Sequence, residues 1–195
     1  MNPTAAADST ETYDAAGRLQ KTVARNGWIT TLTYSDATTP TLVAPRAGLL
    51  IRVKNQFGRE LRFTYDAAGR LAELLPPGAL SGQPAGGTTS PIRYAYNEPA
   101  SLPAGTSARS QLTSVVWQDG SVRRCHHEDA RWPQAVTGIT DEAGVRYGTY
   151  AYDNRGRVTR CELAGGTERL DFAYGNDANG NATSSVTEGT RWWRC

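Results

Sequence analysis

The sequence lacks several features that mark common classes of protein. Its three cysteines, Cys125, Cys161 and Cys195, are too few and too widely spaced for a disulfide framework or a CxxC zinc site. No apolar run reaches the roughly 18 residues of a membrane-spanning helix, and no basic segment followed by an apolar stretch opens the chain. We therefore expect no signal peptide and no membrane insertion.

An excess of charge of one sign is also missing. Twenty-one lysines and arginines stand against 19 aspartates and glutamates, which gives a formal net charge of +2. A surface dedicated to a polyanion needs a larger positive excess, so the bulk charge does not indicate nucleic-acid binding. Lys21 and Lys54 are the only lysines. The basic residues are therefore mostly arginines, whose planar heads stack on aromatic rings and pair with carboxylates.

A sustained helical period is absent, whereas strand signals are frequent. Twenty glycines and ten prolines interrupt short runs in which apolar residues alternate, as in Leu61, Phe63 and Tyr65. Hairpin signals such as Asn26-Gly27 and Asp119-Gly120 separate such runs. The pattern predicts an all-β fold, an antiparallel meander of short hairpins that forms a curved open sheet.

One short motif recurs along the chain. Three copies share a Tyr-Asp pair, a glycine three residues after the aspartate and an arginine after the glycine. They are Tyr13, Asp14, Gly17 and Arg18; Tyr65, Asp66, Gly69 and Arg70; and Tyr152, Asp153, Gly156 and Arg157. The spacing predicts a tight turn, because aspartate accepts a nearby backbone amide and glycine tolerates positive φ. Asp141 and Gly144 repeat this turn spacing.

The arginine of each copy follows the turn, so it has a predicted partner. We expect the guanidinium of Arg70 to lie across the turn on the ring of Tyr65, in its own copy.

The repeats extend over most of the chain. Residues 1–12 are small and polar, which predicts a disordered lead-in. Residues 13–190 form one repeat segment, with exposed loops near 76–90 and 98–110, where proline and glycine disfavour a central strand. Residues 191–195 are expected to be a truncated end.

The ordered set of motifs resembles the YD-repeat of Rhs (rearrangement hotspot) proteins, which are related to teneurin and Tc-toxin shells. The resemblance covers nearly the whole chain. It is most specific from Asp119 to Gly166, where the run Val136-Thr137-Gly138-Ile139-Thr140-Asp141-Glu142-Ala143-Gly144-Val145-Arg146-Tyr147 matches the family pattern. Cys125 and His127 depart from it, because they stand where the family usually has aromatic residues.

The resemblance implies a fold and a function. The family's β ribbon spirals into a hollow, cocoon-like shell that encloses a toxin domain, and a bacterial secretion system, such as type VI secretion, delivers it. The chain would then be a non-catalytic segment of a polymorphic-toxin shell used in bacterial competition, cytoplasmic in its producer before export. Its partners would be the rest of the shell, the toxin domain and a secretion component. We find no Asp-Pro-x-Gly cleavage motif, and we expect an isolated segment to self-associate.

No catalytic, cofactor-binding or metal-binding residues are predicted. His126, His127, Glu128 and Asp129 have metal-ligand side chains, with Cys125 beside them, but adjacent strand residues point to opposite faces. A polar strand end explains them more simply. The acidic residues that could form a glycosidase pair fall at turn positions, and no GxSxG motif accompanies either histidine.

Aromatic and basic residues interleave at residues 93–96 and 191–194, which could stack on bases or sugars. One face of a sheet is the plainer interpretation, so we expect no nucleic-acid partner. The alternative function that stays open is a stand-alone carbohydrate-binding β module. It would use exposed tyrosine and tryptophan side chains, among them Trp117 and Trp192.

Overall fold

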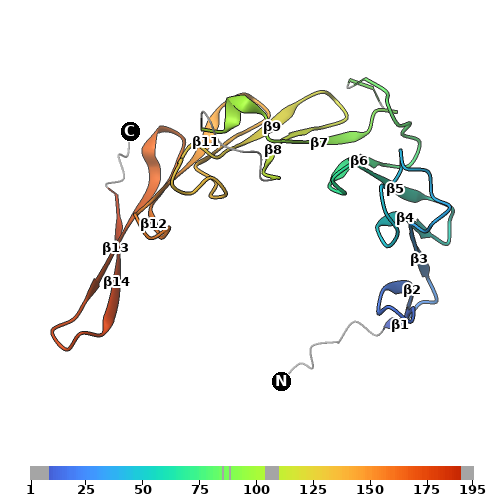
Figure 1. Cartoon of the computed structure of the whole chain (residues 1–195), viewed down its shortest axis with the longest axis horizontal. Coiled ribbons are helices and arrows are strands. Elements are labelled where there is room, and N and C mark those ends of the chain that lie inside the picture. Colours follow the sequence, from blue (N-terminus) through green and yellow to red (C-terminus); the bar gives the residue numbers. More distant parts are fainter. Residues whose placement is uncertain (1–8, 85, 88, 104–109, 190–195) are drawn as a thin grey trace. The chain divides into compact units, whose positions relative to one another are not determined.

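The computed structural model describes residues 9–84, 86–87, 89–103 and 110–189. It confirms the all-β antiparallel meander: the order of strands in the sheet, β1 to β14, follows the sequence, and the sheet does not close (Figure 1). In the described ranges, helix is confined to two three-residue 3₁₀ turns, η1 (Pro99–Ser101) and η2 (Ala164–Gly166). Neither has the length or hydrophobicity of a membrane-spanning helix.

The strands are short and contact mainly their neighbours in sequence. The first compact unit, residues 1–93 with 117–120, contains β1 (Ser9–Tyr13), β2 (Leu19–Ala24), β3 (Ile29–Tyr34), β4 (Leu50–Asn55), β5 (Glu60–Tyr65) and β6 (Leu71–Leu75). Strand β7 (Ile92–Tyr96) begins in this unit.

The second compact unit holds the remaining strands. They are β8 (Leu112–Val116), β9 (Val122–His126), β10 (Gly138–Thr140), β11 (Arg146–Tyr152), β12 (Val158–Leu163), β13 (Thr167–Asn176) and β14 (Ala182–Glu188). The sequence predicts one undivided segment over residues 13–190, whereas the contacts divide it in two. A meander permits this, because each strand packs only against its neighbours and no central core holds all strands together.

The sheet begins earlier than the sequence predicts. Strand β1 starts at Ser9, inside the stretch 1–12 that is expected to be disordered. Thr10 and Glu11 pair with Val23 and Thr22 of β2, although every β1 residue is exposed. Backbone pairing therefore orders a segment whose side chains carry no apolar signal. Residues 1–8 and 191–195 lie outside the described residues.

The hairpin signal at Asn26-Gly27 forms a turn with a three-residue loop, residues 25–27. The amide of Gly27 donates to the carbonyl of Ala24 at 2.8 Å, and the amide of Ala24 donates to the carbonyl of Trp28 at 2.9 Å. Gly27 has a φ of 80°. This is a type I turn closed by a left-handed glycine, a standard three-residue hairpin loop.

The apolar core is thin. Leu75, at the end of β6, is 2% exposed and is the largest buried apolar side chain among the described residues; Pro91, Ala44 and Ala79 are smaller. Most other strand side chains are partly exposed. A single-layer sheet buries little apolar area, so backbone pairing and polar ties carry more of the stability than in a layered fold.

Two loops that the sequence predicts to be exposed are anchored to the sheet. Most of the loop near 76–90 is exposed, but Ala79 and Ser90 are buried, as is Ser101 in the loop near 98–110. Arg62 of β5 donates to the carbonyl of Ala79 at 2.6 Å, and the Ser90 hydroxyl donates to the carbonyl of Pro84 at 2.6 Å. Small side chains let these loops approach the strands closely. Residues 104–109 lie outside the described residues.

Substitution at Leu75 tests the importance of the thin core. Leu75→Ala should lower the free energy of unfolding by about 2–5 kcal/mol, because it leaves a cavity at a buried site. Leu42→Ala, at a leucine that is 89% exposed, should change it by less than about 0.5 kcal/mol. Urea unfolding followed by tryptophan fluorescence measures both values. Equal losses would show that Leu75 does not anchor a core.

Candidate functional site: corners and hairpin ties

Each Tyr-Asp turn, here called a corner (residues 14–18, 66–70 and 153–157), is built around one carboxylate. Oδ1 of Asp14 accepts the backbone amides of Ala16 and Arg18, both at 2.9 Å, and Oδ2 accepts Nε of Arg18 at 2.7 Å. Asp66 and Asp153 repeat every one of these contacts, with arginine Nε at 2.6 and 2.8 Å. The carboxylate therefore closes the turn and orients the arginine.

The glycine of each corner adopts a conformation that other residues rarely reach. Gly17, Gly69 and Gly156 have φ values of 77°, 77° and 75°. At Gly156 an added Cβ would also lie 3.3 Å from the ring of Trp132. The indole N–H of Trp132 donates to the carbonyl of Asp153 at 2.8 Å, so a tryptophan packs over the third corner.

The hydrogen bonds of the corners stabilise the charged form of each aspartate. The backbone amide of Arg18 is the largest cause that lowers the pKa of Asp14, and the amide of Arg157 does the same for Asp153. Burial raises the pKa of Asp66, but hydrogen bonds from Arg70 outweigh it, so this pKa is also lowered. These carboxylates are committed to turn amides and to arginine.

The arginines of the first and third corners stack on tyrosines outside their own copies. The guanidinium of Arg18 lies 5.0 Å from the ring centre of Tyr34, and that of Arg157 lies 4.2 Å from the ring centre of Tyr174. Each ring lies on the second strand after its corner, β3 for Tyr34 and β13 for Tyr174, rather than in the arginine's own copy. The pairing predicted for Arg70 and Tyr65, in the second corner, stays a prediction. At the first and third corners the aspartate holds the arginine toward the next hairpin.

Tyrosine hydroxyls close the open ends of the hairpins. Tyr34, the last residue of β3, donates to the carbonyl of Leu19, the first residue of β2, at 2.9 Å. We call this contact a hairpin tie. Equivalent ties join Tyr65 to Leu50 at 2.7 Å, Tyr152 to Val136 at 2.7 Å and Tyr174 to Val158 at 2.8 Å. Tyr13 differs, since its hydroxyl donates to Glu11.

His127 makes the equivalent contact in the hairpin of β8 and β9. Its Nε2 lies 3.2 Å from the carbonyl oxygen of Leu112, the first residue of β8, and its Nδ1 lies 3.1 Å from that of Ala135. The side chain is 5% exposed. The imidazole thus occupies the place of a tyrosine, which explains how the repeat tolerates a histidine where an aromatic residue is expected.

The sequence did not predict which side chains cap the other turns. Asn55 and Asp177 cap turns of the same hydrogen-bonding pattern, with glycines at 58 and 180. Asp141 and Gly144, which were predicted, form this turn too. The ties of Tyr34 and Tyr174 were also missed. Their signal is a leucine or valine 15 or 16 residues before the aromatic residue.

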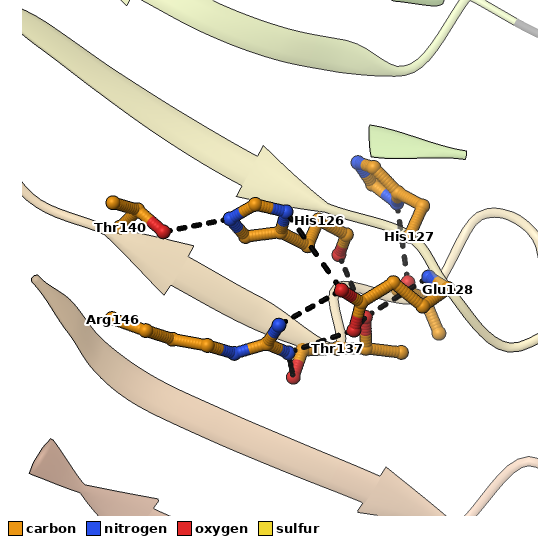
Figure 2. Close-up of polar contacts among 7 residues, drawn as sticks. His126, His127, Glu128, Thr137, Thr140 and Arg146 are labelled. Carbon is orange, nitrogen blue, oxygen red and sulfur yellow. Dashed lines mark hydrogen bonds and ion pairs between the residues drawn. The ribbon is translucent and has the colours of Figure 1, made fainter. Parts of the chain in front are cut away.

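A polar network lies at the end of β9 and crosses to β10 and β11 (Figure 2). Arg146 donates to both carboxylate oxygens of Glu128 at 2.8 Å, and Glu128 also accepts the hydroxyl of Thr137 at 3.0 Å. Nε2 of His126 lies 2.7 Å from the hydroxyl oxygen of Thr140. An added Cβ at Gly138 would collide with the Arg146 guanidinium, so a larger residue there would displace that guanidinium.

Charge in this network is matched rather than left available. Hydrogen bonds from Arg146 lower the pKa of Glu128 to about 2, and burial lowers the pKa of His126. Burial also raises the pKa of the Cys125 thiol, which keeps it protonated. In chemical terms the network is a strong carboxylate–guanidinium pair beside a neutral imidazole, an arrangement suited to joining three strands.

The remaining candidate residues do not come together as a site. Figure 2 shows His126 and His127 directed to different partners, and within the described ranges no three histidine, cysteine, aspartate or glutamate side chains are placed to hold a metal ion. Tyr94 and Tyr96 lie on β7. Trp192 and the rest of the basic aromatic segment at 191–194 lie outside the described residues.

Comparison with known proteins gives one family match. The family described as RHS Repeat matches residues 46–79, which span β4, β5, the second corner and β6. No curated protein matches the sequence significantly.

Solved toxin structures resemble the chain weakly. A chain of the TcdB2-TccC3-Cdc42 crystal structure shares 17% identity, with a TM-score of 0.48 over 94% of this chain and 8% of that one. A chain of the Photorhabdus luminescens Tc holotoxin pore shares 16%, with a TM-score of 0.34 over 89% of this chain and 10% of that one. The protein thus spans about a tenth of the length of these solved chains.

The hairpin tie can be tested by removing one hydroxyl. Tyr152→Phe should lower the free energy of unfolding by about 1 kcal/mol, because the carbonyl of Val136 loses its donor in a partly buried place. Tyr13→Phe is the matched control, since Tyr13 is exposed and makes no tie. Thermal unfolding by circular dichroism compares the two. A larger effect at Tyr13 would contradict the role assigned to the tie.

The Glu128–Arg146 pair predicts a pH dependence. A carboxyl whose pKa is about 2 when folded and higher when unfolded contributes stability above its unfolded pKa. That contribution is lost as pH falls toward 2. Glu128→Gln should therefore cost about 1 kcal/mol at pH 7, after allowance for solvent screening, and almost nothing near pH 2. Glu168→Gln, at an exposed glutamate, is the control. A pH-independent difference between Glu128→Gln and the parent protein would refute the assignment.

Proposed function

We propose, from the premise that residues 46–79 of this chain are an RHS repeat, that the protein is a non-catalytic structural segment of a repeat shell that encloses a toxin domain for delivery between bacteria. The observation that carries the proposal is the repetition of one structural device. In every corner the aspartate accepts a hydrogen bond from the arginine side chain, and neighbouring hairpins carry the same tyrosine tie. The chain therefore extends by adding equivalent units.

The chemistry of the side chains supports a structural role in a shell, here called the wall role, rather than an enzymatic one. The corner aspartates accept turn amides and arginine, Glu128 is paired with Arg146, and His127 contacts two backbone carbonyls. Groups that in an enzyme would be available for acid, base or nucleophilic work are here engaged in holding strands together. A structural segment of a shell requires strands that are held firmly together, and it requires no catalytic residues.

Partners and location follow from the proposed role. The rest of the shell and an enclosed toxin domain would be its neighbours within a larger protein, and a component of a secretion apparatus would carry the assembly. The protein would be made in the cytoplasm of a bacterium that competes with others and would leave through that apparatus, type VI secretion being one such route. DNA sequence on either side should show a continuing repeat array and a toxin cassette.

A second candidate function has one observation in its favour. Trp28 and Phe57, at the tips of neighbouring hairpins, are 57% and 65% exposed and pack edge to face with ring centres 5.6 Å apart. Exposed aromatic pairs of this kind can bind sugars, as in a stand-alone carbohydrate-binding module. Glycan-array binding that is lost in Trp28→Ala would favour carbohydrate binding over the structural role in a shell.

The wall role leads us to expect that isolated copies of the chain associate through the ends of the sheet. Strand β14 lies at one end of the strand order and all seven of its residues are exposed, so within the described ranges it offers an unpaired edge. The 195-residue chain should therefore form concentration-dependent oligomers in sedimentation velocity. Val186→Lys, which places a charge on β14, should shift the distribution toward monomer by about tenfold in apparent dissociation constant.

A second exposed valine provides the control. Val145 is 48% exposed and Val186 is 57% exposed, but Val145 follows a turn and precedes β11. Val145→Lys adds the same charge and should leave the oligomers unchanged. A chain that stays monomeric and heat-stable at all concentrations would count against the wall role. Equal effects of Val186→Lys and Val145→Lys on the oligomers would also count against it.

A further inference from the structure

The tip of the third corner differs from the other two. The first and second corners carry Ala15-Ala16 and Ala67-Ala68 between aspartate and glycine, whereas the third carries Asn154 and Arg155. The backbone is the same, since the amide of Arg155 donates to Oδ1 of Asp153 at 2.8 Å, as the amides of Ala16 and Ala68 do to their aspartates. The turn itself therefore does not require these polar side chains.

These two side chains line a hollow in the second unit. It has a volume of about 610 Å³ and lies between the third corner and the β13–β14 hairpin, drawn in orange and red in Figure 1. Arg157 and Tyr174 line it beside the corner, and Thr183 and Ser184 line it on β14. A volume of this size accommodates a monosaccharide.

The hollow has an uncompensated positive charge. The guanidinium of Arg157 is bound to Asp153 at 2.7 Å and stacks on Tyr174, so its charge is matched. The side chain of Arg155 has no partner in the described part of the chain, and it is exposed. None of the described residues that line the hollow is acidic. A ligand that enters the hollow meets the guanidinium of Arg155, which can donate two hydrogen bonds to a carboxylate.

The other lining groups favour a polyol. Asn154, Thr183 and Ser184 supply amide and hydroxyl groups that can both donate and accept hydrogen bonds. A peptide partner would need apolar anchors that this lining mostly lacks. We propose that the hollow is a binding site for a carboxylate-bearing sugar of the uronate class, with its carboxylate on Arg155 and its hydroxyls on the amide and hydroxyl side chains. The site does not use Trp28.

The other corners provide a variant that should keep the fold. The double substitution Asn154→Ala with Arg155→Ala converts the tip to the Asp-Ala-Ala-Gly-Arg sequence of the first two corners. Arg25→Ala removes an exposed turn arginine elsewhere and is the charge-matched control. Amide spectra of the full chain establish that each variant is folded.

The experiment is an NMR titration of the full chain with galacturonate, followed on backbone amides. We expect saturable shifts at residues 154–157 and 174–184 with a millimolar dissociation constant, at least tenfold weaker binding of neutral galactose, and at least tenfold loss in the double variant. Arg25→Ala should bind as the parent protein does. Absence of saturation, equal affinity for galactose, or unchanged binding in the double variant would overturn the site.

Two further probes separate the sugar from a simple anion. Acetate and inorganic phosphate should bind at least tenfold more weakly than galacturonate, because they cannot engage the hydroxyl-rich side of the hollow. Affinities equal to that of galacturonate would reduce the site to a general anion contact and overturn the assignment to a sugar. Self-association through β14 would shift the amides of residues 182–188 with protein concentration, so the titration is run at a fixed protein concentration and binding is judged at residues 154–157.

Discussion

The corner carboxylate is the contact on which the rest of the structure depends. One oxygen caps two backbone amides and so fixes the turn, while the other holds an arginine. Because the arginine is held, its guanidinium stacks on the tyrosine that ends the next hairpin, and the hydroxyl of that ring bonds the carbonyl of the residue after the arginine. A single aspartate thereby couples the geometry of a turn to the packing of the hairpin that follows.

This coupling compensates for a sheet with little interior. Leu75 is the largest buried apolar side chain among the described residues, and many of the other buried residues are small alanines and serines in loops. Hydrogen bonds add less free energy each than apolar burial of a large side chain, but they fix register. The hairpins of β2–β3, β4–β5, β8–β9, β10–β11 and β12–β13 are each closed at one end by a glycine-containing turn and at the other by a tyrosine or histidine. Their strands are therefore held against sliding past one another.

The sequence predicted the elements whose cause is local. Asp-x-x-Gly turns and alternating apolar residues depend on neighbours in the chain, so the meander and the positions of Asp14, Asp66 and Asp153 could be derived from them. It did not predict which tyrosine would contact Arg18, because that contact depends on the register of β2 and β3. Strand β1 was missed for a related reason: its order comes from the pairing partner and not from its own composition.

The candidate site followed the same division. The polar run at 126–129 was recognised as a strand end, but the role of His127 emerged only when Leu112 and Ala135 were seen on either side of its ring. The hollow at the third corner could not be derived from sequence, since it joins a turn tip to strand residues about 28 positions away. The one available sign was the change from Ala-Ala to Asn-Arg at an otherwise repeated position.

The order of strands has a consequence for biosynthesis. Since strands that neighbour each other in the sheet are also neighbours in the sequence, no strand pair has to wait for a distant part of the polypeptide. A nascent chain could add hairpins one by one as it leaves the ribosome, with each newly made tyrosine securing the preceding pair. Such vectorial growth would keep the exposed length of unpaired edge small while a long array is being translated.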